Sequence, residues 1–105
     1  MMQDSVHYLS LENILVFTQD KMHQLLQVLK KETVLLEKNN IEALESITRE
    51  KIILTEQIEK NEQQRIHFLT NKSLNANEPS QWLDNNKLIS VWNKIKSLST
   101  QAQKQ

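Results

Sequence analysis

The sequence predicts an all-α fold: a long antiparallel helical hairpin, coiled-coil-like in its pattern, with a third helix on its C-terminal side. Three observations support this fold class. The 105 residues include no glycine and one proline, whereas the tight turns of an all-β protein need residues with positive φ, usually glycine. Apolar residues recur in steps of three and four, the period of an amphipathic helix. Finally, Asn39 and Asn40 interrupt that period where a helix–helix turn would fall.

The first long helix is expected over residues 11–38, after a polar start that is either a frayed arm or a first helical turn. A seam of alternating four- and three-residue steps follows the coiled-coil pattern. A further apolar column of Ile14, Val28 and Leu35 widens this seam on one side. Because a wide apolar face suits two neighbours, we expect a third element to pack here. The seam comprises Leu11, Leu15, Thr18, Met22, Leu25, Leu29, Glu32 and Leu36.

The break at Asn39 and Asn40 predicts a short turn between two helices. Asparagine favours caps and turns because its side chain competes for backbone hydrogen bonds. Glu42 follows Asn39 at the spacing of a capping box. So short a connection makes the two long helices antiparallel neighbours. The second helix is expected over residues 41–70, a rod roughly 45 Å long at 1.5 Å per residue.

The C-terminal third of the chain predicts a loop and a third helix. Residues 71–80 collect asparagine, serine, glutamate and proline, which is typical of a loop. The third helix is expected over residues 81–99 or slightly further. With the hairpin it would form a single helical-bundle domain spanning residues 1–105. Its apolar seam consists of Leu88, Val91, Ile95, Leu98 and Ala102, with Trp92 beside it.

Composition argues against several classes of protein. The 13 basic and 13 acidic residues cancel, so there is no basic footprint for nucleic acid and no polybasic membrane patch. The chain has no cysteine, hence no disulfide framework and no thiolate site. The longest early apolar run, residues 14–17, is too short for a signal peptide or a membrane span. We therefore expect a cytoplasmic protein without membrane insertion.

No catalytic, cofactor-binding or metal site is predicted. The three histidines, His7, His23 and His67, have no second histidine or carboxylate pair at metal-ligand spacing on one helix face. Without glycine, no Gly-rich phosphate loop can form. The sequence thus offers no feature in favour of an enzyme.

Two charged residues, Glu32 and Lys51, occupy seam positions on opposite arms of the hairpin. A turn after residue 38 places Glu32 near Ile47, about one helical turn from Lys51, which a long lysine stem can span. We interpret the two as a partly buried ion pair that fixes the register of the hairpin. The alternative is that both side chains extend to water.

Arg65 and the two tryptophans are the remaining candidates for a functional or structural role. The second helix has its own apolar seam, with Lys51 and Arg65 as exceptions, and we interpret Arg65, together with the Glu62, Gln63 and Gln64 run, as a solvated helix end. That seam comprises Leu44, Ile47, Leu54, Ile58 and Phe68. Trp82 and Trp92 have two interpretations, a hydrophobic core or an anchor for a partner, since tryptophan is enriched at interface hot spots.

Motifs along all three helices match one known pattern. The first helix ends in L-x-x-E-x-x-x-L, and after the asparagine turn come I-T-x-E-K-x-x-L and L/I-E-x-x-E-Q-Q-R. In the third helix, Trp92, Ile95 and Leu98 loosely keep the expected apolar spacing. With these motifs the chain resembles the FlgN family of flagellar export chaperones. The other residues that carry the resemblance are Leu29, Glu32, Leu36, Ile47, Thr48, Glu50, Lys51, Leu54, Ile58, Glu59, Glu62, Gln63, Gln64 and Arg65.

The resemblance implies a cytoplasmic chaperone that holds the hook-filament junction proteins, FlgK and FlgL, before the flagellar type III apparatus secretes them. Covering the amphipathic terminal segment of such a client by helix-in-groove contact would prevent premature assembly. Neither enzymatic activity nor a cofactor is implied. In the family, the C-terminal region extends beyond the third helix and is associated with gripping the substrate and contacting the export gate. This chain is expected to be short or truncated there. No residue is therefore assigned to the export gate.

The expected partner surface is the third helix, together with whatever part of the first helix's apolar column it leaves open. The alternative function is a structural coiled-coil adaptor or oligomerisation module, and a homodimer remains open. Sedimentation separates the two, because an obligate symmetric oligomer that buries the third helix leaves no groove for a client. The surface residues are Leu88, Val91, Trp92, Ile95 and Leu98.

Overall fold

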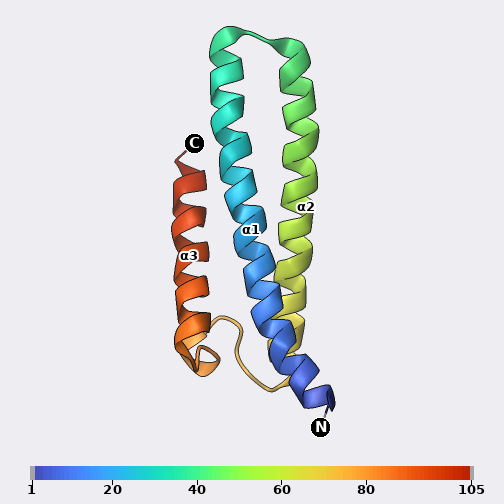
Figure 1. The fold of residues 1–105 in the computed structure, drawn as a ribbon, viewed down its shortest axis with the longest axis vertical. Helices are drawn as coiled ribbons and strands as arrows, with labels where there is room; N and C mark the ends of the chain where they lie inside the picture. The colour runs from blue at the N-terminus through green and yellow to red at the C-terminus, as the bar shows by residue number, and fades with distance from the viewer. Residues whose placement is uncertain (1, 105) are drawn as a thin grey trace.

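The computed structural model describes residues 2–104, with the side chains of residues 11–104. Its elements are α1 (Met2–Lys38), α2 (Ile41–Asn71), a short 3-10 turn η1 (Pro79–Gln81) and α3 (Asn86–Gln103). Helices α1 and α2 form an antiparallel hairpin, and α3 lies along α1 (Figure 1). The molecule is a rod of 55 × 22 × 18 Å. The predicted fold class, a helical hairpin with a third C-terminal helix, is confirmed.

Two helix boundaries differ from the predicted ones. Helix α1 already begins at Met2, so the polar start of the chain belongs to the first helix. Helix α3 begins at Asn86, later than predicted, because the preceding segment contains the turn at Pro79–Gln81 and then leaves the helical path. The side chain of Asn85 caps α3 by accepting a hydrogen bond from the backbone N–H of Leu88 at 2.9 Å.

The hairpin turn consists of two linked caps. Asn39 adopts φ 57°, a left-handed conformation that asparagine tolerates. Its N–H donates to the carbonyl of Leu36 at 3.2 Å, and the N–H of Asn40 donates to that of Leu35 at 3.1 Å, which closes α1 as a Schellman motif. Asn40 then caps α2 by accepting from the N–H of Ala43 at 3.2 Å. The cap is therefore Asn40, one residue later than the predicted capping-box position.

The buried apolar residues form two clusters. The first lies between the hairpin arms and contains Val28, Ile47 and Leu54. The second joins all three helices and the connecting loop. It confirms that a third element packs on α1, through Leu11 and Leu15, whereas Val28 and Leu35 of the predicted wider column pack against α2 instead. Its buried members are Leu11, Leu15, Leu69, Trp82, Leu88 and Ile95.

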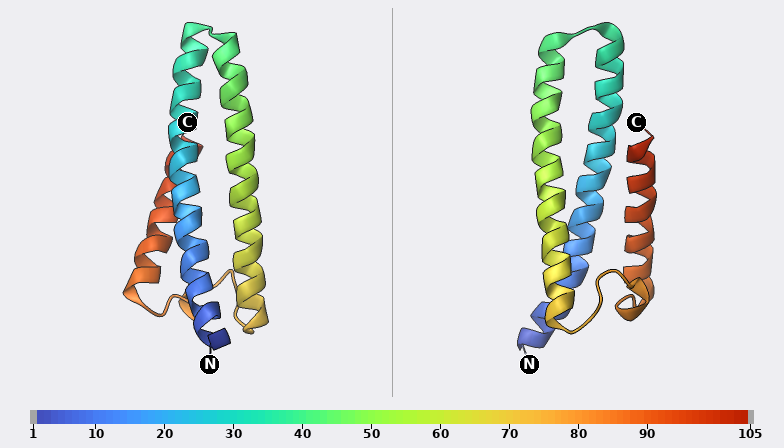
Figure 2. Two further views of the ribbon diagram at one scale, coloured as in Figure 1. Left: turned by 45° about the vertical axis from the view of Figure 1, so that its right-hand side comes forward. Right: turned by 180° about the vertical axis from the view of Figure 1, so that it is seen from behind.

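Helix α3 is shorter than the hairpin and covers only part of it. It runs beside the lower and middle parts of α1 and ends below the hairpin turn (Figures 1 and 2). We call the three-helix part, including residues 72–85, the base, and the two-helix part, residues 28–38 and 41–54, the hairpin end. The predicted seam is wrong at Leu36, which is 61% exposed close to the hairpin turn.

Candidate functional site

The predicted partner surface on α3 is closed by the protein itself. Leu88, Ile95 and Leu98 are buried, and Val91 and Trp92 are half-buried against the same cluster. Leu11 and Leu15 of α1 are buried in the cluster that contains Leu88 and Ile95 of α3. The expectation of a free surface on α3 is thereby corrected, because these side chains serve as core while α3 is docked. A partner could reach Leu88, Ile95 or Leu98 only if α3 left α1.

A buried arginine holds the base together. The guanidinium carbon of Arg65 lies 5.3 Å from the ring centroid of Trp82 and 5.0 Å from that of Trp92. The two indoles meet edge-to-face, with centroids 5.0 Å apart and planes at 79°. Cation–π contacts of this kind strengthen when the cation is shielded from water, and the Arg65 side chain is only 8% exposed. The cluster therefore ties α2 to the loop and to α3.

Three hydrogen bonds also hold the same guanidinium in place. Its Nε and Nη2 donate to Glu62 Oε2 at 3.0 and 2.8 Å, and its Nη1 donates to the carbonyl of Ala76 at 3.0 Å. The interpretation of Arg65 as part of a solvated helix end is wrong. Its position on the apolar seam was the available signal, because a charged residue there either escapes to water or finds a complete set of partners.

A second buried polar contact lies between the hairpin arms. The side-chain amide of Asn61 donates to the carbonyl of Ile14 at 2.7 Å and to Thr18 Oγ1 at 2.9 Å. Thr18 Oγ1 in turn donates to the carbonyl of Ile14 at 2.9 Å. Since both side chains are buried, the contact favours one alignment of α1 and α2 over slipped ones.

The structure brings Glu32 and Lys51 together. Lys51 Nζ lies 2.7 Å from Glu32 Oε2, with the lysine side chain 35% and the glutamate side chain 21% exposed. The pair is thus partly buried and spans the two arms where the seam places it. Its proposed role in fixing register stays a prediction.

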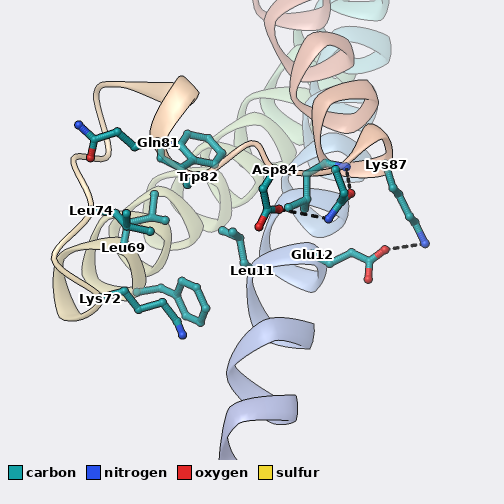
Figure 3. Close-up of a pocket in the computed structure, with 12 residues that line it drawn as sticks. Leu11, Glu12, Leu69, Lys72, Leu74, Gln81, Trp82, Asp84 and Lys87 are labelled. Carbon is teal, nitrogen blue, oxygen red and sulfur yellow. Dashed lines mark hydrogen bonds and ion pairs between the residues drawn. The ribbon is translucent and has the colours of Figure 1, made fainter.

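The base also contains a small pocket where α1, the end of α2, the loop and the start of α3 meet (Figure 3). Its volume is about 270 Å³, smaller than usual cofactor sites and large enough for a bulky side chain. Leu11, Leu69 and Trp82 point towards its interior, and a Lys87–Glu12 ion pair of 2.6 Å stands at one edge. It is an apolar recess with a mixed-charge rim.

The hairpin end keeps large aliphatic side chains in contact with solvent. They lie on both helices beyond the reach of α3, and a monomer that exposes several such residues together usually has a partner for them. They are Val34 (46% exposed), Leu36 (61%), Ile41 (67%), Ile52 (51%) and Ile53 (55%). Of these five residues, the sequence analysis predicted a role only for Leu36, and it predicted a buried seam position rather than an exposed one.

The described side chains supply binding surfaces. Among them, no three His, Cys, Asp or Glu side chains are grouped so as to hold a metal ion. Within residues 2–104, no helix has the length and apolar character required to span a membrane. The base provides a packed helical scaffold and the hairpin end exposed aliphatic side chains beside it, as in proteins that hold another protein's helix.

The comparison with protein families identifies the chain within that class. The family model described as FlgN protein matches residues 2–105, so the chain belongs to the FlgN family, which is a family of flagellar export chaperones. Neither the comparison with curated proteins nor the comparison with solved structures gives a match.

Proposed function

We propose that this protein is a cytoplasmic export chaperone for hook-filament junction proteins of the FlgK and FlgL kind. It binds their amphipathic terminal segment, prevents that segment from assembling early, and delivers the client to the flagellar type III export apparatus. Family membership supports the chaperone role. The observation that carries the binding mode is the uncovered apolar surface of the hairpin end.

The client helix would lie on the hairpin end, past the C-terminal end of α3. There the hairpin is a two-helix surface with no third element on it, as the ribbon views show (Figure 2). Ile41 and Ile52 are three helical turns apart and so share one face of α2, while Leu36 stands on α1. An amphipathic helix placed there would convert exposed leucine and isoleucine into buried contact.

The expected affinity is moderate. Burying a leucine or isoleucine side chain is worth about 1.5–3 kcal/mol. Ordering a client segment that is disordered when free takes roughly 2–5 kcal/mol from the gross interaction energy. The net binding free energy that remains is suited to a chaperone, because a chaperone must hold its client and later release it.

The test is a titration with labelled C-terminal peptides of junction proteins, followed by fluorescence anisotropy. We expect the double variant Leu36→Asp with Ile52→Asp to weaken binding about tenfold or more, since it places charge on the surface to be buried. The matched control is the double variant Ile66→Asp with Ile89→Asp, which makes the same kind of change at two exposed residues of the base, and it should bind like the wild type. Equal binding by both variants would contradict the proposed surface.

Tryptophan fluorescence, recorded in the same titration, reports on the position of α3. Trp82 is buried and Trp92 half-buried in the base, so a client on the hairpin end should leave their emission nearly unchanged. A strong red shift on binding would show that α3 is displaced and that Leu88, Ile95 and Leu98 take part after all. An obligate dimer in sedimentation that buries the hairpin end would favour the adaptor function instead.

A further inference from the structure

A groove runs along the α1–α2 interface and is lined only by residues of α1, α2 and the C-cap of α2. It consists of two hollows of about 600 and 470 Å³ that share Ile14 and Gln64, so they are continuous. We call it the lateral groove. From Gln57 to Lys72 it extends about 22 Å along α2, which is four turns of helix. No side chain of α3 lines it, and α3 packs on α1 elsewhere.

The lateral groove has an apolar line with polar walls. Ile14, Phe17 and Phe68 provide apolar surface, and Phe17 is 42% exposed. The walls are otherwise amide side chains, with His67 and two lysines among them. Large apolar side chains from both α1 and α2, flanked by hydrogen-bonding groups, are suited to an amphipathic helix laid along the groove.

The charge of the lateral groove is one-sided. Its lining includes Lys60 and Lys72 and no aspartate or glutamate, although acidic and basic residues are equal in number in the whole chain. Lys72 Nζ lies 5.2 Å from the Phe68 ring centroid, and Lys21 Nζ lies 5.1 Å from that of Phe17. Lys60 makes no ion pair with any side chain that the structure describes. Complementarity therefore favours an acidic partner.

One side-chain oxygen at the lateral groove has no hydrogen-bond donor in the part of the chain that the structure describes. Gln57 Oε1 is buried and has no hydrogen-bond partner among the described residues. A buried acceptor without a donor is unfavourable, and a partner side chain with an O–H or N–H could satisfy it. Gln57 lines the groove at the end nearer the hairpin turn.

We propose that the lateral groove binds an acidic amphipathic helix of a partner protein. The apolar stripe of that helix would rest on Ile14, Phe17 and Phe68, and its acidic flanks would face Lys60 and Lys72. This surface is separate from the hairpin end, and the inference does not depend on the proposed client. A second copy of the chain is a poorer occupant, since a groove that binds a different face of another copy makes a head-to-tail contact, which gives a ring or an open filament rather than a simple two-fold dimer.

The test uses two fluorescein-labelled 16-residue peptides with the same leucine stripe at helical spacing, one flanked by glutamate and the other by lysine. Binding is followed by anisotropy in low salt. We expect the glutamate peptide to bind and the lysine peptide to bind at least about tenfold more weakly. The variant Lys60→Glu with Lys72→Glu should lower the affinity for the glutamate peptide about tenfold, and Phe17→Ala should lower it as well.

The matched control is Lys94→Glu with Lys96→Glu, which makes the same charge change on exposed residues of α3 and should leave binding unchanged. Circular dichroism of each variant verifies that the helices remain. The proposal is overturned if both peptides bind alike, or if the two charge reversals have the same effect. It is also overturned if a single-stranded oligonucleotide of matched charge competes as well as the glutamate peptide, or if sedimentation shows that the chain's own dimer fills the groove.

Discussion

The base and the hairpin end are built from the same two helices, yet the most exposed large apolar side chains all lie at the hairpin end. In the base, Leu15 and Leu69 are completely buried. At the hairpin end, Leu36 and Ile41 are 61% and 67% exposed on helices that are equally regular. In the base, α3 and its loop add cover to the hairpin, whereas the hairpin end buries only side chains between its two arms, such as Val28 and Leu54. The uncovered part is where we propose that a client binds.

The largest expected effect contrasts one leucine from each region. Leu15→Ala should lower the free energy of unfolding by about 3 kcal/mol, because it leaves a cavity in a side-chain cluster with no solvent access. Leu36→Ala should lower it by less than about 0.5 kcal/mol, as for other exposed positions. Urea unfolding followed by circular dichroism measures both. Equal losses would mean that the hairpin end is as closed as the base.

The second largest effect is expected for Arg65, the buried arginine of the base. Arg65→Ala removes two cation–π contacts and leaves the carbonyl of Ala76 without its donor, so we expect a loss of roughly 2–4 kcal/mol. Arg49→Ala, an exposed arginine of the hairpin end, should cost less than about 0.5 kcal/mol. Tryptophan emission during urea unfolding follows the base directly. If Arg65→Ala lowered the free energy of unfolding no more than Arg49→Ala does, the contacts of Arg65 with Trp82 and Trp92 would not stabilise the base.

The smallest effect concerns the ion pair between the arms. A double-mutant cycle with Glu32→Gln and Lys51→Gln should give a coupling energy below about 1 kcal/mol, because both groups still contact water. The coupling should shrink in 1 M salt, where the screening length is about 3 Å. A coupling of several kcal/mol that resists salt would indicate a much drier pair than the structure shows.

Much of the fold could be predicted because its signals are local. Apolar steps of three and four specified the long helices, and the asparagine pair specified the turn between them. The wide apolar face of α1 required a third element, and the structure has one. The end of α1 that this element covers was not predictable, since it depends on how far the loop after Asn71 carries the chain before Asn85 caps α3.

The partner surface was harder to predict for a related reason. A helix seam such as Leu88, Ile95 and Leu98 has the same pattern whether it is buried within the chain or offered to another protein. Arg65 was misjudged because its ring partners, Trp82 and Trp92, come from later in the chain and are brought to it only by tertiary structure. Exposure at the hairpin end likewise results from the absence of a neighbour, which no local pattern encodes.

Amide hydrogen exchange, measured with and without a junction-protein C-terminal peptide, tests the central claim most directly. The account predicts slower exchange at the hairpin end, over residues 28–38 and 41–54, because a bound client stabilises the part of the rod that lacks a third helix. Exchange in α3 should stay as slow as in the free protein. Unchanged exchange at the hairpin end, with faster exchange throughout α3, would contradict the account.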